Sequence, residues 1–467
     1  FRRAPPAQLG DNEHRRLQTL ADLGLAVAKG FIEDVLPHGR AGFDHLNGQE
    51  FRAWLRSHGA HPDTTWSAPI RALYDLGFSF VEGASASADN AQVAAGIALR
   101  IMLLIMFGSK DAPLWKMQAG MGDTVFTPFY EVLCKREVHF EFFHRVESLD
   151  PSPSGKLVQR IRLIRQVRVA QPPYQPLVCV EHLPCWPSEP CWDQIEDGAA
   201  IAHRLAEAKL TLESSACTEQ VEPLELKLGR DFDLVVLGIS LGELRRISPG
   251  LSTCNDDWRM MLDNVPTVST QAFQLWLTAS LENLGWTAGP TVQTAYAEPF
   301  DTWGEMSHLI PRESWKPPNL PASIHYFCGA LTEGASASEV KKSAMEWLRD
   351  YGGHLWPNAV LKDGSFNWEL LVDPDSRGGE PRFDSQYWRA NTEGSERYVL
   401  STPGSIRFRL PPEASGFGNL FLAGDWTATL AGGKVKVETG IKPDSLVTFV
   451  LSEKSFIEVV TGQRANL

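Results

Sequence analysis

The strongest candidate for chemistry in this 467-residue chain is a glycine-rich segment near its end, residues 416–433, GFGNLFLAGDWTATLAGG. Within it, Leu420 to Ala423 predict a short apolar strand, and Gly424 lets a ligand approach the backbone because glycine has no side chain. Asp425 then offers a carboxylate at the carboxyl end of that strand, the edge at which open α/β sheets bind ligands. A carboxylate there can accept hydrogen bonds from sugar or ribityl hydroxyls, which predicts a nucleotide cofactor. A strand that ends in an ordinary aspartate turn is the alternative interpretation.

Two further segments carry patterns that accompany such a cofactor. Residues 118–124, QAGMGDT, precede a predicted helix over 125–136, whose proline falls in the first turn, and a predicted strand over 138–146, VHFEFFHRV. Residues 231–244, DFDLVVLGISLGEL, predict a buried strand, a glycine turn and the start of a helix, as in a doubly wound sheet.

Taken in their order along the chain, the three segments resemble FAD-binding motifs of the flavin amine oxidases, the phytoene desaturases and related isoprenoid dehydrogenases. The resemblance spans residues 118–427, about two-thirds of the chain, and each motif is weak when taken alone. It implies that Asp425, flanked by Gly424, Trp426 and Thr427, contacts the ribityl or pyrophosphate part of FAD.

The same resemblance implies roles for the other two segments. The strand that follows the 118–124 turn ends at Val146, whose backbone is expected to meet the adenine, with Arg145 beside it. Residues 231–244 are similar to the family's strand that returns to the nucleotide-binding sheet. The cofactor expected from the resemblance is FAD, which would accept the hydride while the protein supplies position and electrostatics.

Two departures from the family pattern concern the rest of the cofactor site. The N-terminal strand with G-x-G-x-x-G, which holds the pyrophosphate at a helix N-terminus, is absent from this sequence. We expect the chain to begin after that segment, as a processed fragment or a subunit cut from a larger precursor. Past Asp425 the family continues into a helix, whereas residues 431–440, AGGKVKVETG, alternate like a strand. Either Glu438 takes the family glutamate's role or this end is rebuilt, with strands over 446–460 forming a hairpin.

The sequence assigns no catalytic residue and no metal ligand. Many amine oxidases place a lysine near the flavin on a central strand, yet the corresponding residues 270–276, TQAFQLW, contain none. This favours a dehydrogenation that needs no such lysine. Three cysteines in a proline-rich loop, Cys179, Cys185 and Cys191, are separated by five intervening residues each, and that spacing is too wide for a typical structural zinc site.

The elements that must position these residues predict an α/β fold. In it, a partial FAD-binding, Rossmann-like (doubly wound) domain is interleaved with a mixed α+β substrate domain. Helical periodicity over 11–36 and 49–55 predicts a mainly helical first hundred residues, and strands at 271–277 and 323–328 and a helix over 338–351 follow later. We expect four segments: 1–114, a mainly helical part of the substrate domain; 115–250, an FAD-binding part with inserted strands and the proline-rich loop; 251–400, the substrate domain; and 401–467, the C-terminal FAD-binding segment with an atypical tail.

The most apolar run in the chain is 91–108, AQVAAGIALRIMLLIMFG. Because Gln92 and Arg100 interrupt it, a buried helix is a better interpretation than a transmembrane segment. If this helix lines a pocket instead, its leucine and methionine side chains favour an apolar substrate.

The composition excludes one class of partner. The net charge of −13, with a pI near 5.5 and no Lys/Arg cluster interleaved with aromatics, argues against nucleic-acid binding. Seven cysteines form an odd, sparse set that fits reduced thiols and a cytoplasmic location. The N-terminal residues lack the pattern of a secretory signal.

The leading hypothesis is therefore an FAD-dependent oxidoreductase, a dehydrogenase, desaturase or oxidase, acting on an apolar or amine small molecule. The alternative is a flavin-less binding or scaffold subunit that keeps the fold. In a third hypothesis, a second chain carries the N-terminal dinucleotide-binding segment and completes the site across an interface.

Overall fold

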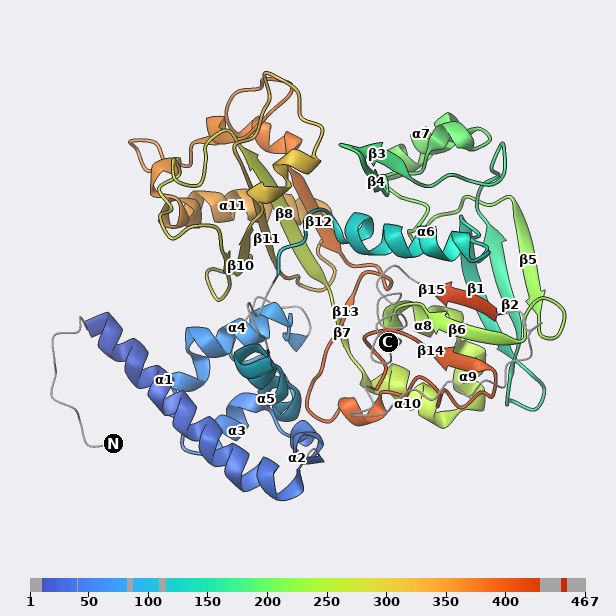
Figure 1. The fold of residues 1–467 in the computed structure, drawn as a ribbon, viewed down its shortest axis with the longest axis horizontal. Helices are drawn as coiled ribbons and strands as arrows, with labels where there is room; N and C mark the ends of the chain where they lie inside the picture. The colour runs from blue at the N-terminus through green and yellow to red at the C-terminus, as the bar shows by residue number, and fades with distance from the viewer. Residues whose placement is uncertain (1–10, 40, 82–86, 109–114, 429–446, 452–467) are drawn as a thin grey trace.

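The structure is a computed structural model that describes residues 11–39, 41–81, 87–108 and 115–428 and the backbone of 447–451. Helices and strands are mixed along the chain. Figure 1 shows three neighbouring parts: N-terminal helices in blue, a five-stranded sheet in yellow and orange, and a third part that combines a parallel and an antiparallel sheet. The mixed α/β class predicted from the sequence is confirmed.

The N-terminal part consists of helices around one apolar cluster. Its α-helices are α1 (Asp11–Gly30), α2 (Ala41–His45), α3 (Phe51–Ser57), α4 (Ala68–Leu76) and α5 (Ala95–Leu103), the last continuing into a π-helical turn, η6 (Leu104–Gly108). Trp54, Tyr74 and Leu99 are fully buried in this cluster, which also includes Ala330 of the five-stranded sheet. The helices therefore pack against that sheet. Among the described residues, no helix is long and apolar enough to cross a membrane.

Three parallel strands form the sheet that carries the glycine–aspartate segment. Strand β6 (Leu234–Gly238) lies between β14 (Leu420–Leu422) and β15 (Val447–Leu451). Burial alternates along β6 and β14: Val235, Leu237, Leu420 and Leu422 are buried, whereas Phe421 is 38% exposed, so one face of this sheet is covered more completely than the other. Helices α8 (Leu241–Ile247), α9 (Pro249–Cys254) and α10 (Asp256–Asn264) follow β6 and share its apolar cluster.

An antiparallel sheet packs against the parallel one. Its order is β1-β2-β5, with bounds β1 (His144–Pro151), β2 (Val158–Arg165) and β5 (Glu222–Lys227). Leu149, Val158 and Ile161 point into the cluster shared with β6 and β14. The side-chain amide of Asn419, just before β14, donates to the Val158 carbonyl at 2.9 Å and accepts from the Val158 N–H at 2.8 Å. This pair of bonds fixes the start of β14 on β2.

Short elements surround the antiparallel sheet. A π-helical turn, η7 (Gly122–Phe126), and α6 (Thr127–Lys135) lead toward β1, and α6 lies between the two large sheets in Figure 1. The connection between β2 and β5 contains a hairpin, β3 (Val178–Val180) and β4 (Leu183–Cys185), followed by α7 (Gly198–Ala208). The seven cysteines of the chain carry free thiols.

The five-stranded sheet has the order β12-β8-β11-β10-β9 and is antiparallel throughout. Its strands are β8 (Thr270–Leu277), β9 (Val292–Gln293), β10 (Thr302–Glu305), β11 (Ser323–Ala330) and β12 (Tyr387–Asn391). Helix α11 (Ala337–Leu355), which begins with a capping box between Ser336 and Glu339, packs its apolar stripe on β8 and β12. A two-stranded antiparallel ribbon pairs β7 (Thr267–Val268), which immediately precedes β8 of this sheet, with β13 (Tyr398–Val399).

Most predicted elements are confirmed. Helices occupy the predicted stretches near 11–36, 125–136 and 338–351, and β6 followed by α8 reproduces the strand, turn and helix predicted at 231–244. Strands β8 and β11 match the predictions at 271–277 and 323–328 to within a few residues.

Two predictions need correction, and one is tested only in part. The strand predicted at 138–146 begins only at His144, because Phe143 adopts a left-handed conformation with φ of 61° that interrupts the extended chain. The helix at 91–108 is buried only in its first half, since Met106 and Phe107 are 62% and 75% exposed. In the tail, the segment 447–451 forms a strand that pairs with β6 in parallel, whereas Glu438 and the remainder of the hairpin predicted over 446–460 lie outside the described residues.

Candidate functional site

The predicted cofactor segment forms a tight turn at the carboxyl end of β14. The Ala423 N–H donates to the Leu237 carbonyl at 2.9 Å, which fixes the end of β14 beside the end of β6. The Thr427 N–H and hydroxyl both donate to the Gly424 carbonyl, at 3.2 and 2.8 Å, and close the turn. Gly424 has a φ of 148°, which favours glycine. Asp425 lies exposed at the tip of the turn.

The other side chains of this turn point inward. Trp426 is fully buried in the cluster formed by β6, β14 and helices α8 to α10. Its indole N–H has no hydrogen-bond partner within the described part of the chain. Thr427 is 9% exposed and its hydroxyl is used in closing the turn. Asp425 is consequently the exposed residue of the Gly424–Thr427 turn.

Arg409 connects the turn to the irregular segment that follows β13. Its Nη1 donates to the Asp425 carbonyl at 2.6 Å, and its Nη2 donates to the Leu400 carbonyl at 3.2 Å and the Ser401 hydroxyl at 3.0 Å. The Ser401 carbonyl in turn accepts from the Ala94 N–H at 2.8 Å, immediately before α5. A guanidinium suits this role because its planar fork presents several donors at once. No local sequence pattern indicates this role for Arg409, because its partners lie elsewhere along the chain.

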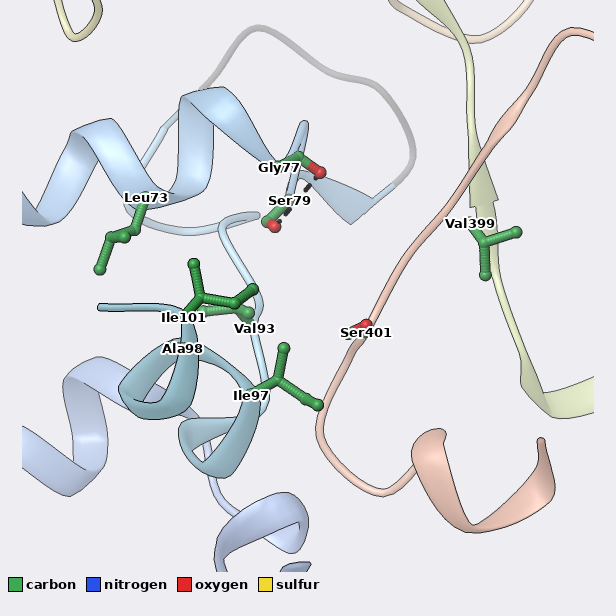
Figure 2. A pocket seen from close by; sticks show the side chains of 9 residues that line it. All are labelled: Leu73, Gly77, Ser79, Val93, Ile97, Ala98, Ile101, Val399 and Ser401. Atoms are coloured by element: carbon green, nitrogen blue, oxygen red, sulfur yellow. Dashed lines mark hydrogen bonds between the residues drawn. The ribbon is translucent and has the colours of Figure 1, made fainter. Parts of the chain in front are cut away.

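Ser401 also lines a small apolar cavity between the N-terminal helices and the segment that follows β13, shown in Figure 2. The cavity has a volume of about 170 Å³. Its walls are mainly aliphatic and come from α4, the loop before α5, α5 and β13: Leu73, Val93, Ile97, Ala98, Ile101 and Val399. The helix at 91–108 thus lines a cavity with its first half, which was the second interpretation of that sequence.

The predicted adenine-side residues lie on β1, paired with β2. Val146 is opposite Leu163, and its carbonyl accepts from Arg246 Nη2 at 3.3 Å. Arg145 donates from Nε to Glu147 at 2.6 Å and from Nη1 to the Cys217 carbonyl. Val146 packs against the cluster that contains Trp426, so the adenine-side strand and the glycine–aspartate turn share one core. The Arg145 side chain is held by protein partners.

A larger cavity of about 640 Å³ opens at the start of β1. Phe142 and Tyr174 in its wall form an edge-to-face pair with ring centroids 5.3 Å apart. His144 lies beside them, and burial lowers its pKa, so this imidazole is more readily neutral than a free histidine. Arg165, Arg168 and Glu196 add charged groups to the lining. Aromatic faces with polar groups around them are suited to a flat heterocyclic ligand.

The central strand of the five-stranded sheet contains no lysine, but one reaches the sheet from outside it. Lys116 donates from Nζ to the carbonyl and, at 3.1 Å, to the carboxylate of Glu305 on β10. Although burial opposes ionisation, bonds from Ser307 and Lys116 lower the pKa of Glu305. Nearby His325 is fully buried, and desolvation lowers its pKa to about 3, which makes it a neutral core residue.

Comparisons with known proteins do not assign the chain to a family. No family model matches it, and no curated protein matches it. Among solved structures, an oxidoreductase from Methanosarcina mazei is 11% identical, with a TM-score of 0.46 over 90% of this chain and 71% of that one. A cyclohexylamine oxidase from Brevibacterium oxydans is 12% identical (TM-score 0.44; 91% and 72% covered), and a putrescine oxidase 10% (0.42; 90% and 72%). Likeness at this level defines neither a family nor a function.

Proposed function

We propose that this chain functions as an FAD-dependent oxidoreductase and that Asp425 contacts the ribityl or pyrophosphate part of the cofactor. The observation that carries the proposal is the Gly424–Thr427 turn, which presents one exposed carboxylate where the carboxyl ends of β14 and β6 lie side by side. This edge of a parallel sheet is where such folds bind nucleotides.

The residues at this edge fit a flavin nucleotide in part. The Asp425 carboxylate can accept hydrogen bonds from cofactor hydroxyls, and Gly424 leaves room for the cofactor to approach the backbone. Arg409 holds the Asp425 carbonyl and so orients the turn. FAD, when bound, would supply the hydride acceptor. Val146 and Arg145 remain the proposed adenine-side contacts, and the aromatic cavity at the start of β1 offers a surface for a base to stack on.

For the substrate, we propose an apolar small molecule or an amine with an apolar body. The cavity against α5 is lined by aliphatic side chains, and Arg409 links its Ser401 wall to the Asp425 turn. Desolvation by such walls favours an apolar group over a charged one. The choice among dehydrogenase, desaturase and oxidase stays open. The four-segment organisation and a cytoplasmic location, which free thiols would tolerate, belong to the same proposal.

A second candidate is a flavin-less binding or scaffold subunit. The protein contacts made by Arg145 and by the Val146 carbonyl favour it, because these groups already have partners. A third candidate is completion of the site by a second chain that carries the phosphate-binding segment. Native mass spectrometry that finds FAD bound to a single kind of chain would rule out the third candidate.

The test is FAD binding by the purified protein, followed by its visible spectrum and by quenching of flavin fluorescence on titration. We expect Asp425→Asn to weaken FAD binding about tenfold, since hydrogen bonds to a charged group contribute about 1.5–3 kcal/mol. Asp363→Asn, at an exposed turn whose carboxylate accepts hydrogen bonds from Ser365, is the matched control and should bind FAD like the wild type. Absence of flavin binding by the wild type, alone and with an added dinucleotide-binding segment, sinks the proposal in favour of the scaffold.

A further inference from the structure

Three carboxylates meet in the interior, between the N-terminal helices and the five-stranded sheet. Asp75 comes from the last turn of α4, and Glu298 and Asp301 come from the loop before β10, more than two hundred positions later in the sequence. One oxygen from each lies within 4.8 Å of the others. Their separation along the chain is the reason that no sequence pattern points to this site.

The cluster is buried and short of hydrogen-bond donors. Asp75 and Asp301 are each 1% exposed. Within the described residues, neither oxygen of Asp75 has a hydrogen-bond partner, and neither does Oδ2 of Asp301. The Ala295 amide lies close enough to lower the pKa of Asp75 without reaching hydrogen-bond geometry. A buried, ionised carboxylate without donors is strongly unfavourable, so this arrangement requires either protons or a bound cation.

Arg71 is the cation that faces the cluster, and it does not neutralise all three acids. Its Nη2 pairs with Glu298 at 3.1 Å, while Nε is buried without a partner in the described chain. With all three carboxylates ionised, one guanidinium leaves two negative charges. Asp75 also lies in the last turn of α4, where the helix dipole favours a positive charge over a negative one.

The fold holds these groups in place through close backbone contacts. The loop at 298–301 lies directly on β11, where a Cβ at Gly329 would come within 2.2 Å of the Pro299 carbonyl. Gln271 on β8 donates to the same carbonyl at 3.4 Å. The Thr302 hydroxyl donates to Oδ1 of Asp301 at 2.7 Å and leaves Oδ2 directed elsewhere. The positions of the acids are therefore fixed by the sheet.

We propose that Asp75, Glu298 and Asp301 bind one divalent cation, calcium, which joins the N-terminal helices to the five-stranded sheet. Oxygen-only ligands select a hard cation. Three carboxylates can supply up to about six oxygens, so calcium can be coordinated by protein groups in a buried site, whereas magnesium keeps several of its waters. The span between the ligand atoms fits within the first coordination sphere of calcium, whose radius is about 2.3–2.6 Å. This proposal does not depend on flavin binding.

The experiment uses the full chain after removal of metals with EDTA. Calcium, magnesium or zinc chloride is added back, and binding is followed by isothermal titration and by the thermal unfolding temperature. We expect one calcium per chain and an increase in the unfolding temperature, with magnesium weaker. Asp75→Asn and Glu298→Gln, which keep the side-chain shapes, should each weaken calcium binding about tenfold or more. Asp363→Asn, an exposed acid outside the cluster, is the control and should bind like the wild type.

Two results would overturn the proposal. If calcium fails to bind or to stabilise the EDTA-treated wild type, the acids share protons instead of a cation. If calcium stabilises the wild type, Asp75→Asn and Glu298→Gln equally, it binds elsewhere. Glu298 is half-buried, so Glu298→Gln provides a folded test even where Asp75→Asn fails to fold.

Discussion

Asp425 and Asp75 place the same functional group in opposite surroundings. Asp425 lies at the exposed tip of a turn that is closed by backbone and threonine hydrogen bonds. Asp75 lies 1% exposed at the end of a helix, beside two further acids. The first carboxylate is exposed to solvent and can accept hydrogen bonds from a ligand that brings its own hydroxyl donors. The second can be ionised only if a cation comes with it, so burial changes a hydrogen-bond acceptor into a site for protons or a metal.

The largest expected effect comes from the tryptophan beside Asp425. If the turn offers only its aspartate to ligands, Trp426 is a core residue, and Trp426→Ala should lower the free energy of unfolding by about 3–5 kcal/mol. Chemical denaturation measures this loss. Trp115→Ala, at a position 75% exposed, is the control and should cost little. A small effect on stability at Trp426, accompanied by loss of FAD binding, would instead make Trp426 a cofactor contact. Asp425 would then not be the sole ligand contact that the turn offers.

The next effect is a pH dependence that belongs to the acid cluster. Burial first, and then the charges of Asp301 and Glu298, raise the pKa of Asp75 from 3.8 to about 8, against the opposing charge of Arg71. Burial and Asp301 likewise raise the pKa of Glu298 from 4.5 to about 7, and burial raises that of Asp301 to about 6. Without metal, the folded protein therefore holds protons that the unfolded chain has already lost.

The sign of the pH effect follows from this difference. The contribution of the cluster to stability is fully present below about pH 4 and is lost as the pH rises toward about 8, by several kcal/mol in total. Chemical denaturation in EDTA measures the free energy of unfolding of the wild type and of Asp75→Asn across this pH range. The difference between the two separates the contribution of the cluster from that of other carboxylates. Calcium should flatten the curve above neutral pH. An equal pH dependence in the wild type and in Asp75→Asn would show that the cluster does not titrate in this window.

The same two aspartates show what could be predicted from the sequence. The turn at Asp425 was predicted because its strand, glycine and acid are consecutive, and local pattern determines local geometry. Asp75 gave no such signal, since its partners lie on a distant loop. Arg409 and Lys116 were missed for the same reason: their contacts to Asp425 and Glu305 are created by tertiary packing.

The errors in predicted elements have a similar cause. An alternating apolar pattern predicted a strand from 138, but the left-handed Phe143 delays β1 to His144, and period-two reasoning contains no information about φ. Most of the fold could be predicted because long buried runs such as β6 and β8 have one favourable conformation. The cavities and the acid cluster could not, because each combines residues from several segments.

A smaller effect is expected at Gly424, whose φ of 148° is strained for any other residue. Gly424→Ala should lower the free energy of unfolding by about 2 kcal/mol and should weaken FAD binding if the backbone here contacts the cofactor. Gly24→Ala is the matched control, because Gly24 lies within α1 with no atom within 4 Å of an added Cβ. That variant should be neutral or slightly stabilising. Equal effects at both positions would mean that the turn is not constrained as described.

The smallest expected effect tests whether the turn and the apolar cavity are coupled. Arg409 bonds to the Asp425 carbonyl, the Leu400 carbonyl and the Ser401 hydroxyl, and Ser401 lines the cavity against α5. Arg409→Gln removes these bonds from partly exposed groups and should cost about 1 kcal/mol of stability.

The effect of Arg409→Gln on binding is more informative than its effect on stability. If Arg409 orients the turn, the variant should weaken FAD binding several-fold while leaving the calcium affinity of the buried cluster unchanged. Arg407→Gln, two residues away and exposed, controls for the loss of one positive charge. Equal weakening of FAD binding by both variants would mean that the effect is general electrostatic attraction. Coupling of the Asp425 turn to the cavity through the hydrogen bonds of Arg409 would then be rejected.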